Sequence, residues 1–234
     1  LENFMSTENS NLIYVSARAS FPWLASPQEQ VNDKGEKTYS YSTDLIFPPS
    51  DPGVAKFMQA YAAIAADKWK ENAQAAMQQI NSDKRTRCFG AGDEKKSQKT
   101  FQVHPGYAGN VYITARNTNQ PQIIDVDGRQ IDPSNTLALR AAAAKIYGGC
   151  YVNAVIKPWP QANTKGIGIR CELVAIQFAK DGEAFGAGTP ADVSNMFGAS
   201  VAAAPMGANP FAPVAAAPAM PAAPFGVPGV PSFM

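Results

Sequence analysis

The chain is poor in the residues on which catalysis and metal binding most often depend. It contains one histidine, His104, and three cysteines among 234 residues. A Ser-His-Asp triad would rest on His104 alone, and this residue lies in the turn-forming run Val-His-Pro-Gly. The cysteines Cys88, Cys150 and Cys171 form no CxxC pair and no even framework, which disfavours a disulfide scaffold or a thiolate metal site. We therefore expect a protein that is not an enzyme and that uses no cofactor and no metal.

Long apolar runs and an N-terminal secretion pattern are also missing. No apolar run reaches the roughly 18 residues of a membrane span, so we expect no membrane partner. The first residues lack the charged-then-apolar order of a signal peptide. Residues 1–4 precede a Met-Ser-Thr that resembles a natural start, and we expect residues 1–11 to lie outside the folded domain. The three cysteines fit small buried thiols in a reducing cytoplasm.

Net charge is close to zero, but the charges are unevenly distributed. The chain has 20 basic and 19 acidic residues. Acidic residues predominate before Asp51, whereas Lys84–Lys99 is rich in lysine and arginine, and every charge in Pro133–Cys171 is positive. Local fields decide whether a polyanion is attracted, so these two segments favour a nucleic acid as partner.

Two glycine-containing segments resemble known sites only superficially. Gly90–Ser97 lacks the GxxxxGK[ST] spacing of a phosphate-binding loop, because no glycine directly precedes its lysines. In Asp125–Gly128 the glycine comes too early for a calcium loop. We interpret the first as a basic loop that contacts phosphate and the second as a hairpin turn.

The hydrophobic pattern predicts several short strands and one long helix. Leu12–Ala19 alternates as a half-buried strand, which Phe21-Pro22-Trp23 should end, since proline cannot continue a ladder. Ser26–Lys37 is predicted to be a loop and Thr38–Phe47 a second strand. Further strands are predicted at Asn110–Arg116, in a hairpin over Gln122–Ile131 and in a hairpin over Tyr147–Lys180.

Ser50-Asp51-Pro52 is a typical helix start, and apolar residues follow at helical spacing to Ile80. Short strands with one inserted helix predict an all-β OB-fold, a five-stranded Greek-key barrel, over residues 12–197. Residues 198–234 are rich in alanine and proline and are predicted to be a disordered tail. The tail is either a docking segment for a partner protein or a solubilising end.

Aromatic and basic residues alternate on the outward faces of three predicted strands. Such a surface suits single-stranded nucleic acid, because bases stack on rings while cations hold phosphates. The alternative is an ordinary hairpin with a solvated basic face. The residues predicted to bind nucleic acid, from these strands and the basic loop, are Tyr14, Arg18, Arg85, Arg87, Lys95, Lys96, Lys99, Tyr112, Arg116, Tyr151, Lys157, Trp159 and Arg170.

The runs GCYVNAVIKPW and GIRCELVAIQFAKDGEAFG, with GYAGNVYITARN upstream, resemble a bacteriophage family of OB-fold single-stranded DNA-binding proteins. One departure is that Arg87–Asp93 replaces an Arg-Asp-Gly-Asp block that the family often carries. The resemblance implies a role in phage DNA replication, recombination and repair in the cytoplasm of the infected bacterium. It is also compatible with self-association on DNA, and with replication or recombination proteins that bind the tail. A phage structural or scaffold protein and an RNA-preferring module are the alternatives.

Overall fold

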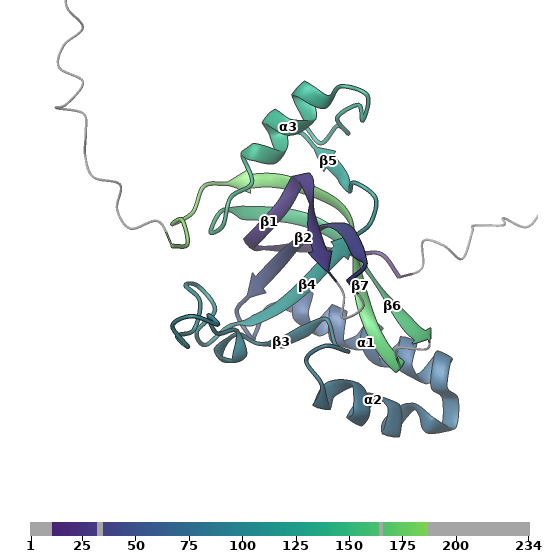
Figure 1. Cartoon of the computed structure of the whole chain (residues 1–234). Helices are drawn as coiled ribbons and strands as arrows, with labels where there is room; N and C mark the ends of the chain where they lie inside the picture. Colours follow the sequence, from purple (N-terminus) through teal and green to yellow (C-terminus); the bar gives the residue numbers. More distant parts are fainter. Residues whose placement is uncertain (1–10, 32–34, 164–165, 187–234) are drawn as a thin grey trace, which may run out of the picture. The chain divides into compact units, whose positions relative to one another are not determined.

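The computed structural model describes residues 11–31, 35–163 and 166–186. The predicted tail, and all but the last residue of the predicted N-terminal segment, lie outside these residues. The strands are β1 (Ile13–Val31), β2 (Lys37–Phe47), β3 (Phe89–Ala91), β4 (Val111–Asn117), β5 (Gln122–Ile124), β6 (Tyr151–Asn163) and β7 (Gly166–Lys180). They form one sheet in the order β3-β4-β2-β1-β6-β7-β5 (Figure 1).

Five of these strands close into a barrel. Antiparallel pairing joins β4, β2, β1, β6 and β7 in turn, and a parallel contact at Arg116 and Glu172 connects β4 back to β7. Cys150, directly before β6, and the alternating β6 residues Val152, Ala154 and Ile156 are all buried inside the barrel. The predicted all-β OB-type barrel is therefore confirmed, with β3 and β5 as additional short strands.

The prediction that β1 ends at Phe21-Pro22-Trp23 is wrong. The strand continues to Val31, and its pairing with β2 shifts register between Ser20 and Trp23 and again before Gln28. Such irregularities bend a strand and allow a proline within it, because the unpaired position needs no ladder hydrogen bond. Most of the loop predicted after this point is thus strand.

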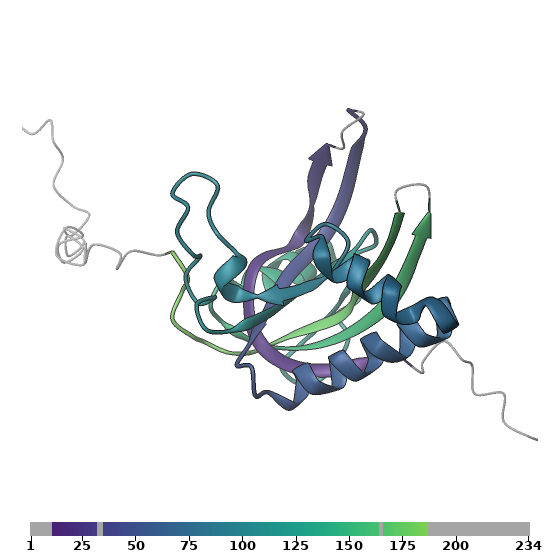
Figure 2. The same cartoon turned by 90° about the horizontal axis from the view of Figure 1, so that it is seen from below.

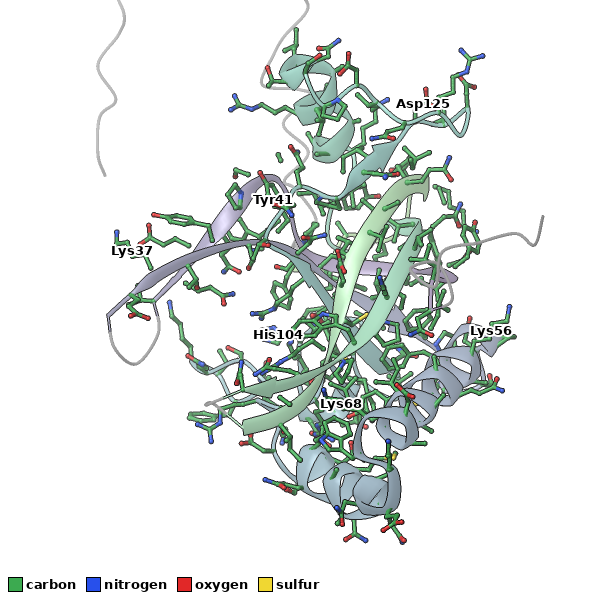
Figure 3. All side chains as sticks on the ribbon, turned by 90° about the vertical axis from the view of Figure 1, so that its right-hand side faces the viewer. Lys37, Tyr41, Lys56, Lys68, His104 and Asp125 are labelled. Carbon is green, nitrogen blue, oxygen red and sulfur yellow. The ribbon has the colours of Figure 1, made fainter. Side chains whose placement is uncertain are left out.

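Two long hairpins project from the same side of the barrel as arms (Figure 2). We call residues 24–31 of β1 with 37–41 of β2 the first arm, and residues 157–163 of β6 with 166–172 of β7 the second arm. Lys37 lies near the outer end of the first arm (Figure 3). The second arm pairs continuously from Lys157 with Glu172 out to Asn163 with Gly166.

The predicted long helix is divided into two. Asp51 caps α1 (Pro52–Trp69) by accepting a 2.7 Å hydrogen bond from the Gly53 amide. Lys70 has a φ of 46°, which is incompatible with a continuing right-handed helix, and a 3₁₀ turn (Lys70–Asn72) leads into α2 (Ala73–Ser82). α1 packs on β1 and β6, and α2 contacts β7.

A further helix, α3 (Thr136–Ala144), was not predicted from the sequence. The Asn135 side chain caps it by accepting from the Ala138 amide, and its apolar residues Leu139 and Ala143 are buried towards the barrel. Its run of alanines gives helix propensity but little hydrophobic periodicity, so the pattern carried a weak signal. α3 contacts β1 and β5, away from the two arms (Figure 1).

Candidate nucleic-acid groove

A groove of about 960 Å³ lies between the two arms. One wall is formed by Gln30 and Thr38–Ser40 of the first arm, and the other by Trp159, Gln161 and Arg170 of the second. Its floor comes from β4 and from the residues around β3, with Arg116 at the base. The groove exists because both hairpins extend well beyond the barrel on the same side (Figure 2).

The groove brings together seven of the thirteen residues predicted to bind DNA. Lys157 and the loop lysines Lys96 and Lys99 do not line it, nor do Tyr14, Arg18 and Tyr151. The predicted residues that do line it are Arg85, Arg87, Lys95, Tyr112, Arg116, Trp159 and Arg170.

Several of the basic residues in the groove are neutralised by carboxylates. Lys95 Nζ lies 2.7 Å from Asp44 Oδ2, behind the floor. Arg87 and Lys84 both pair with the Glu94 carboxylate. Because these charges are already balanced within the protein, they attract a polyanion less than their number implies.

Arg116 and Arg170 have neutral partners instead. Arg116 Nη1 donates to Gln30 Oε1 over 3.1 Å, and Arg170 Nε donates to Gln161 Oε1 over 2.8 Å. Among the described residues neither arginine forms an ion pair; Glu172, near Arg116, accepts from Asn117 instead. Burial lowers the pKa of the Arg170 guanidinium, the direction expected when a charge loses water without gaining a carboxylate. Each arginine can exchange an amide oxygen for a phosphate oxygen.

Aromatic side chains are presented from both walls. Trp159 is 41% exposed and pairs across the second arm with Arg170. Tyr39 on the first arm is 50% exposed, and its hydroxyl donates to Glu29 over 2.9 Å. Tyr39 is not among the residues predicted from the sequence to bind DNA, although it lies on an alternating strand. The sequence does not show that this strand extends into an arm whose residues line the same groove as Trp159.

The tyrosine of β4 is covered rather than free. Tyr112 is only 8% exposed because the loop that follows β3 folds over it, placing Lys95 Nζ 4.7 Å from its ring centre. Its neighbour Tyr107 is fully buried and donates a 2.6 Å hydrogen bond to Asp44. Burial, with the nearby Asp44 charge, raises the pKa of both tyrosines. Tyr112 therefore supports the groove floor and presents little ring surface for stacking.

Arg18 is held by main-chain carbonyl groups. It donates to Gly149 O at 3.1 Å and to Glu183 O at 2.7 Å, and its guanidinium lies 4.4 Å from the Phe185 ring centre. Phe185 in turn packs against Gly106, where a Cβ would come 2.1 Å from the ring. The segment KDGEAFG is thus a strap that ties β7 to the loop carrying Tyr107, and Arg18 is part of its anchor.

Tyr14 and Tyr151 lie on a different surface. Tyr14 pairs with Val155, and Tyr151 pairs with Arg18, across β1 and β6. The Tyr151 ring has two cationic neighbours, Arg18 and Lys180, with the Lys180 Nζ 4.6 Å from the ring centre. These residues form an aromatic and basic face, but it is separate from the groove.

The comparisons with known proteins agree with this architecture. The model of the family described as "Enterobacter phage Enc34, ssDNA-binding protein" matches residues 10–203. The chain belongs to this family of phage single-stranded DNA-binding proteins. It is 29% identical over 189 residues to protein p50 of Acyrthosiphon pisum secondary endosymbiont phage 1, covering 80% of this chain and 92% of that protein.

Solved structures of the bacteriophage Enc34 single-stranded DNA-binding protein are also similar. The structure in complex with ssDNA has a TM-score of 0.57 and 27% identity, covering 76% of this chain and 91% of the other. A second structure of the same protein has a TM-score of 0.54 and 26% identity, covering 81% and 91%.

No group of three or more histidine, cysteine, aspartate or glutamate side chains is placed to hold a metal ion in the part of the chain that the structure describes. In the same residues, no helix combines the length and apolar character that crossing a membrane requires.

Proposed function

We propose that this protein binds single-stranded DNA in the groove between its two arms, with little sequence preference. The observation that carries the proposal is the pairing of exposed rings on the walls with Arg116 and Arg170, whose partners are neutral amides. Rings accept any base face, and guanidinium groups accept any phosphate. The similar Enc34 protein, solved in complex with ssDNA, supports the assignment.

The geometry supports a simple division of roles. Trp159, and Tyr39 on the facing wall, offer ring surface to bases. Arg116 and Arg170 exchange their glutamine partners for phosphate oxygens, an exchange that leaves no buried carboxylate unpaired. Lys95, held by Asp44, positions the floor.

Binding of this kind covers bases and backbone together. A protein of this family that coats exposed single strands would protect them during phage DNA replication, recombination and repair, in the cytoplasm of the infected bacterium. The rival assignment, a phage structural or scaffold protein with an incidental basic face, does not explain why exposed rings converge in one groove with two arginines that have only amide partners.

A competition titration tests the proposal. Fluorescence anisotropy of a labelled dT oligomer is measured with unlabelled dT, rU and duplex competitors over a range of salt concentrations. We expect dT to compete best, and log K to fall linearly with log[salt] by about 0.7 per neutralised phosphate. Equal competition by rU would show an RNA-tolerant module instead, and absence of binding at low salt would overturn the assignment.

A further inference from the structure

Two exposed phenylalanines adopt a backbone conformation that side chains rarely take. Phe21, at the bend of β1, has a φ of 47°, and Phe101 has a φ of 58°. Phe21 is 47% exposed and Phe101 is 77% exposed. A bulky residue with positive φ costs free energy, and persists only where the surroundings enforce it. Burial in the core explains neither residue, so their exposure needs another reason.

Phe101 lies on an ordered loop. The loop Lys95–His104 forms a hairpin-like turn with a bridge between Lys96 and Val103. Within it the Ser97 amide donates to Gln102 O and the Phe101 amide donates to Ser97 O, both at 2.9 Å. The turn therefore holds the Phe101 ring in solvent by its own hydrogen bonds.

A series of rings connects this loop to the groove. The ring centre of Tyr112, on the groove floor, lies 5.7 Å from the ring centre of Tyr107. The ring centre of Tyr107 lies 6.2 Å from that of His104, which is labelled in Figure 3. His104 makes an edge contact with Phe21 at 5.0 Å. Lys95 belongs to both places, because it begins the loop and lines the groove. Tyr107 is fully buried and Tyr112 nearly so, so these rings support the loop and Phe21 from beneath, and at the surface Lys95 joins the loop to the groove.

The charge of this surface favours a polyanion. Lys96 and Lys99 are exposed on the loop, and no acidic residue occurs between Lys95 and Tyr107. The nearest acids in sequence have partners already: Asp93 accepts from the Gly109 amide, and Glu94 pairs with Arg87. Figures 1 and 2 show the loop on the opposite side of the first arm from the second arm.

We propose that Phe21, Phe101, Lys96 and Lys99 form a second stacking platform for the same DNA strand after it leaves the groove past Lys95. The platform rests on the proposed function, because it extends that binding path. Phe101 offers a ring face to a base, Phe21 is backed by His104, and the two lysines hold the adjoining phosphates. The backbone strain is maintained because it keeps both rings exposed.

Oligomer length tests the platform. Affinities are measured for a dT series spanning about 4 to 16 nucleotides, the range of a single OB-fold site, at one protein per oligomer. For Phe101→Ala, and separately for the double variant Lys96→Ala with Lys99→Ala, we expect wild-type affinity for the shortest oligomer that binds. For the longest oligomer we expect a loss of about fivefold or more, the lower range of one lost stacking contact. Phe101→Trp should retain affinity, and its added indole fluorescence should be quenched only by the longer oligomers.

The control is Leu137→Ala, which removes an 81% exposed apolar side chain from α3 and should bind every length as the wild type does. Phe21→Ala is informative only if its melting temperature is unchanged, because Phe21 also packs on Tyr107. Wild-type affinity of Phe101→Ala and of the lysine variant at every length would overturn the platform while leaving the groove intact. Failure of the wild-type protein to bind any length would overturn the proposed function itself.

Discussion

Lys95 Nζ lies 2.7 Å from Asp44 Oδ2, although Asp44 is only 4% exposed. The same carboxylate accepts 2.6 Å hydrogen bonds from the hydroxyls of Tyr107 and Thr114. One buried aspartate on β2 therefore organises β4, the loop after β3 and a lysine of the groove. Because β4 and the loop after β3 both depend on this one charge, Asp44 is a structural centre of the groove floor.

Asp44→Asn should destabilise the fold. The change leaves Lys95 without its counter-charge and weakens two short hydrogen bonds, a loss on the order of 3 kcal/mol in the free energy of unfolding. Urea denaturation followed by circular dichroism measures it. Asp132→Asn, which alters an exposed turn carboxylate, is the matched control and should change stability far less. Equal stability of the two variants would contradict the role given to Asp44.

The salt dependence of DNA binding should distinguish two kinds of basic residue in the groove. Arg116→Gln and Arg170→Gln should each lower the slope of log K against log[salt] by about 0.7, because each removes one phosphate contact. Lys84→Gln is the control, since Glu94 already balances its charge, and it should change the slope less. If Lys84→Gln changed the slope as much as the arginine variants, ion pairing would not decide which residues bind phosphate.

Trp159→Ala should weaken DNA binding by roughly 1–3 kcal/mol with little change in melting temperature, because the ring is exposed on the second arm. Tyr151→Ala is the comparison, since its ring is exposed to a similar degree but lies outside the groove. We expect a smaller loss for Tyr151→Ala in the same anisotropy assay. The reverse order would place the DNA on the outer face of β1 and β6.

Alkaline conditions should unfold the protein through its buried tyrosines. Burial raises the pKa of Tyr107 and Tyr112 above the ordinary value of about 10. Their contribution to stability is complete below about pH 10. Between about pH 10 and the folded-state pKa the two tyrosines ionise only in the unfolded chain, so this contribution is lost as pH rises through that range. Tyr107→Phe should flatten this fall, as measured by denaturation midpoints across pH. An unchanged slope in the variant would exclude Tyr107 as a source.

Two truncations should separate the predicted tail from the strap. A chain ending at Phe197 should melt at nearly the full-length temperature and bind single strands at least as well. A chain ending at Lys180 loses Phe185 and the Tyr147 hydroxyl's partner Asp181, and should melt markedly lower. Calorimetry on both chains checks this. Loss of folding in the longer truncation would show that the domain boundary is wrong.

Local patterns predicted many of the strands because their signal lies in neighbouring residues. Alternation identified β6 and its buried face in the barrel, and an aspartate-proline pair identified the start of α1. The bend of β1 and the break at Lys70 could not be predicted in this way. Both depend on pairing and packing with distant segments, which override the local preference at Pro22 and within an alanine-rich helix.

The sequence by itself determined the family, the barrel and the basic, aromatic character of the segments around the groove. Only the tertiary structure decided which charges remain available to DNA. Lys95 is neutralised by Asp44 and Arg18 is bound by carbonyls of Gly149 and Glu183, all far away in the chain. Arg116 meets an amide instead. The field at a site depends on distances in space, so a residue's charge can be known from sequence while its role cannot.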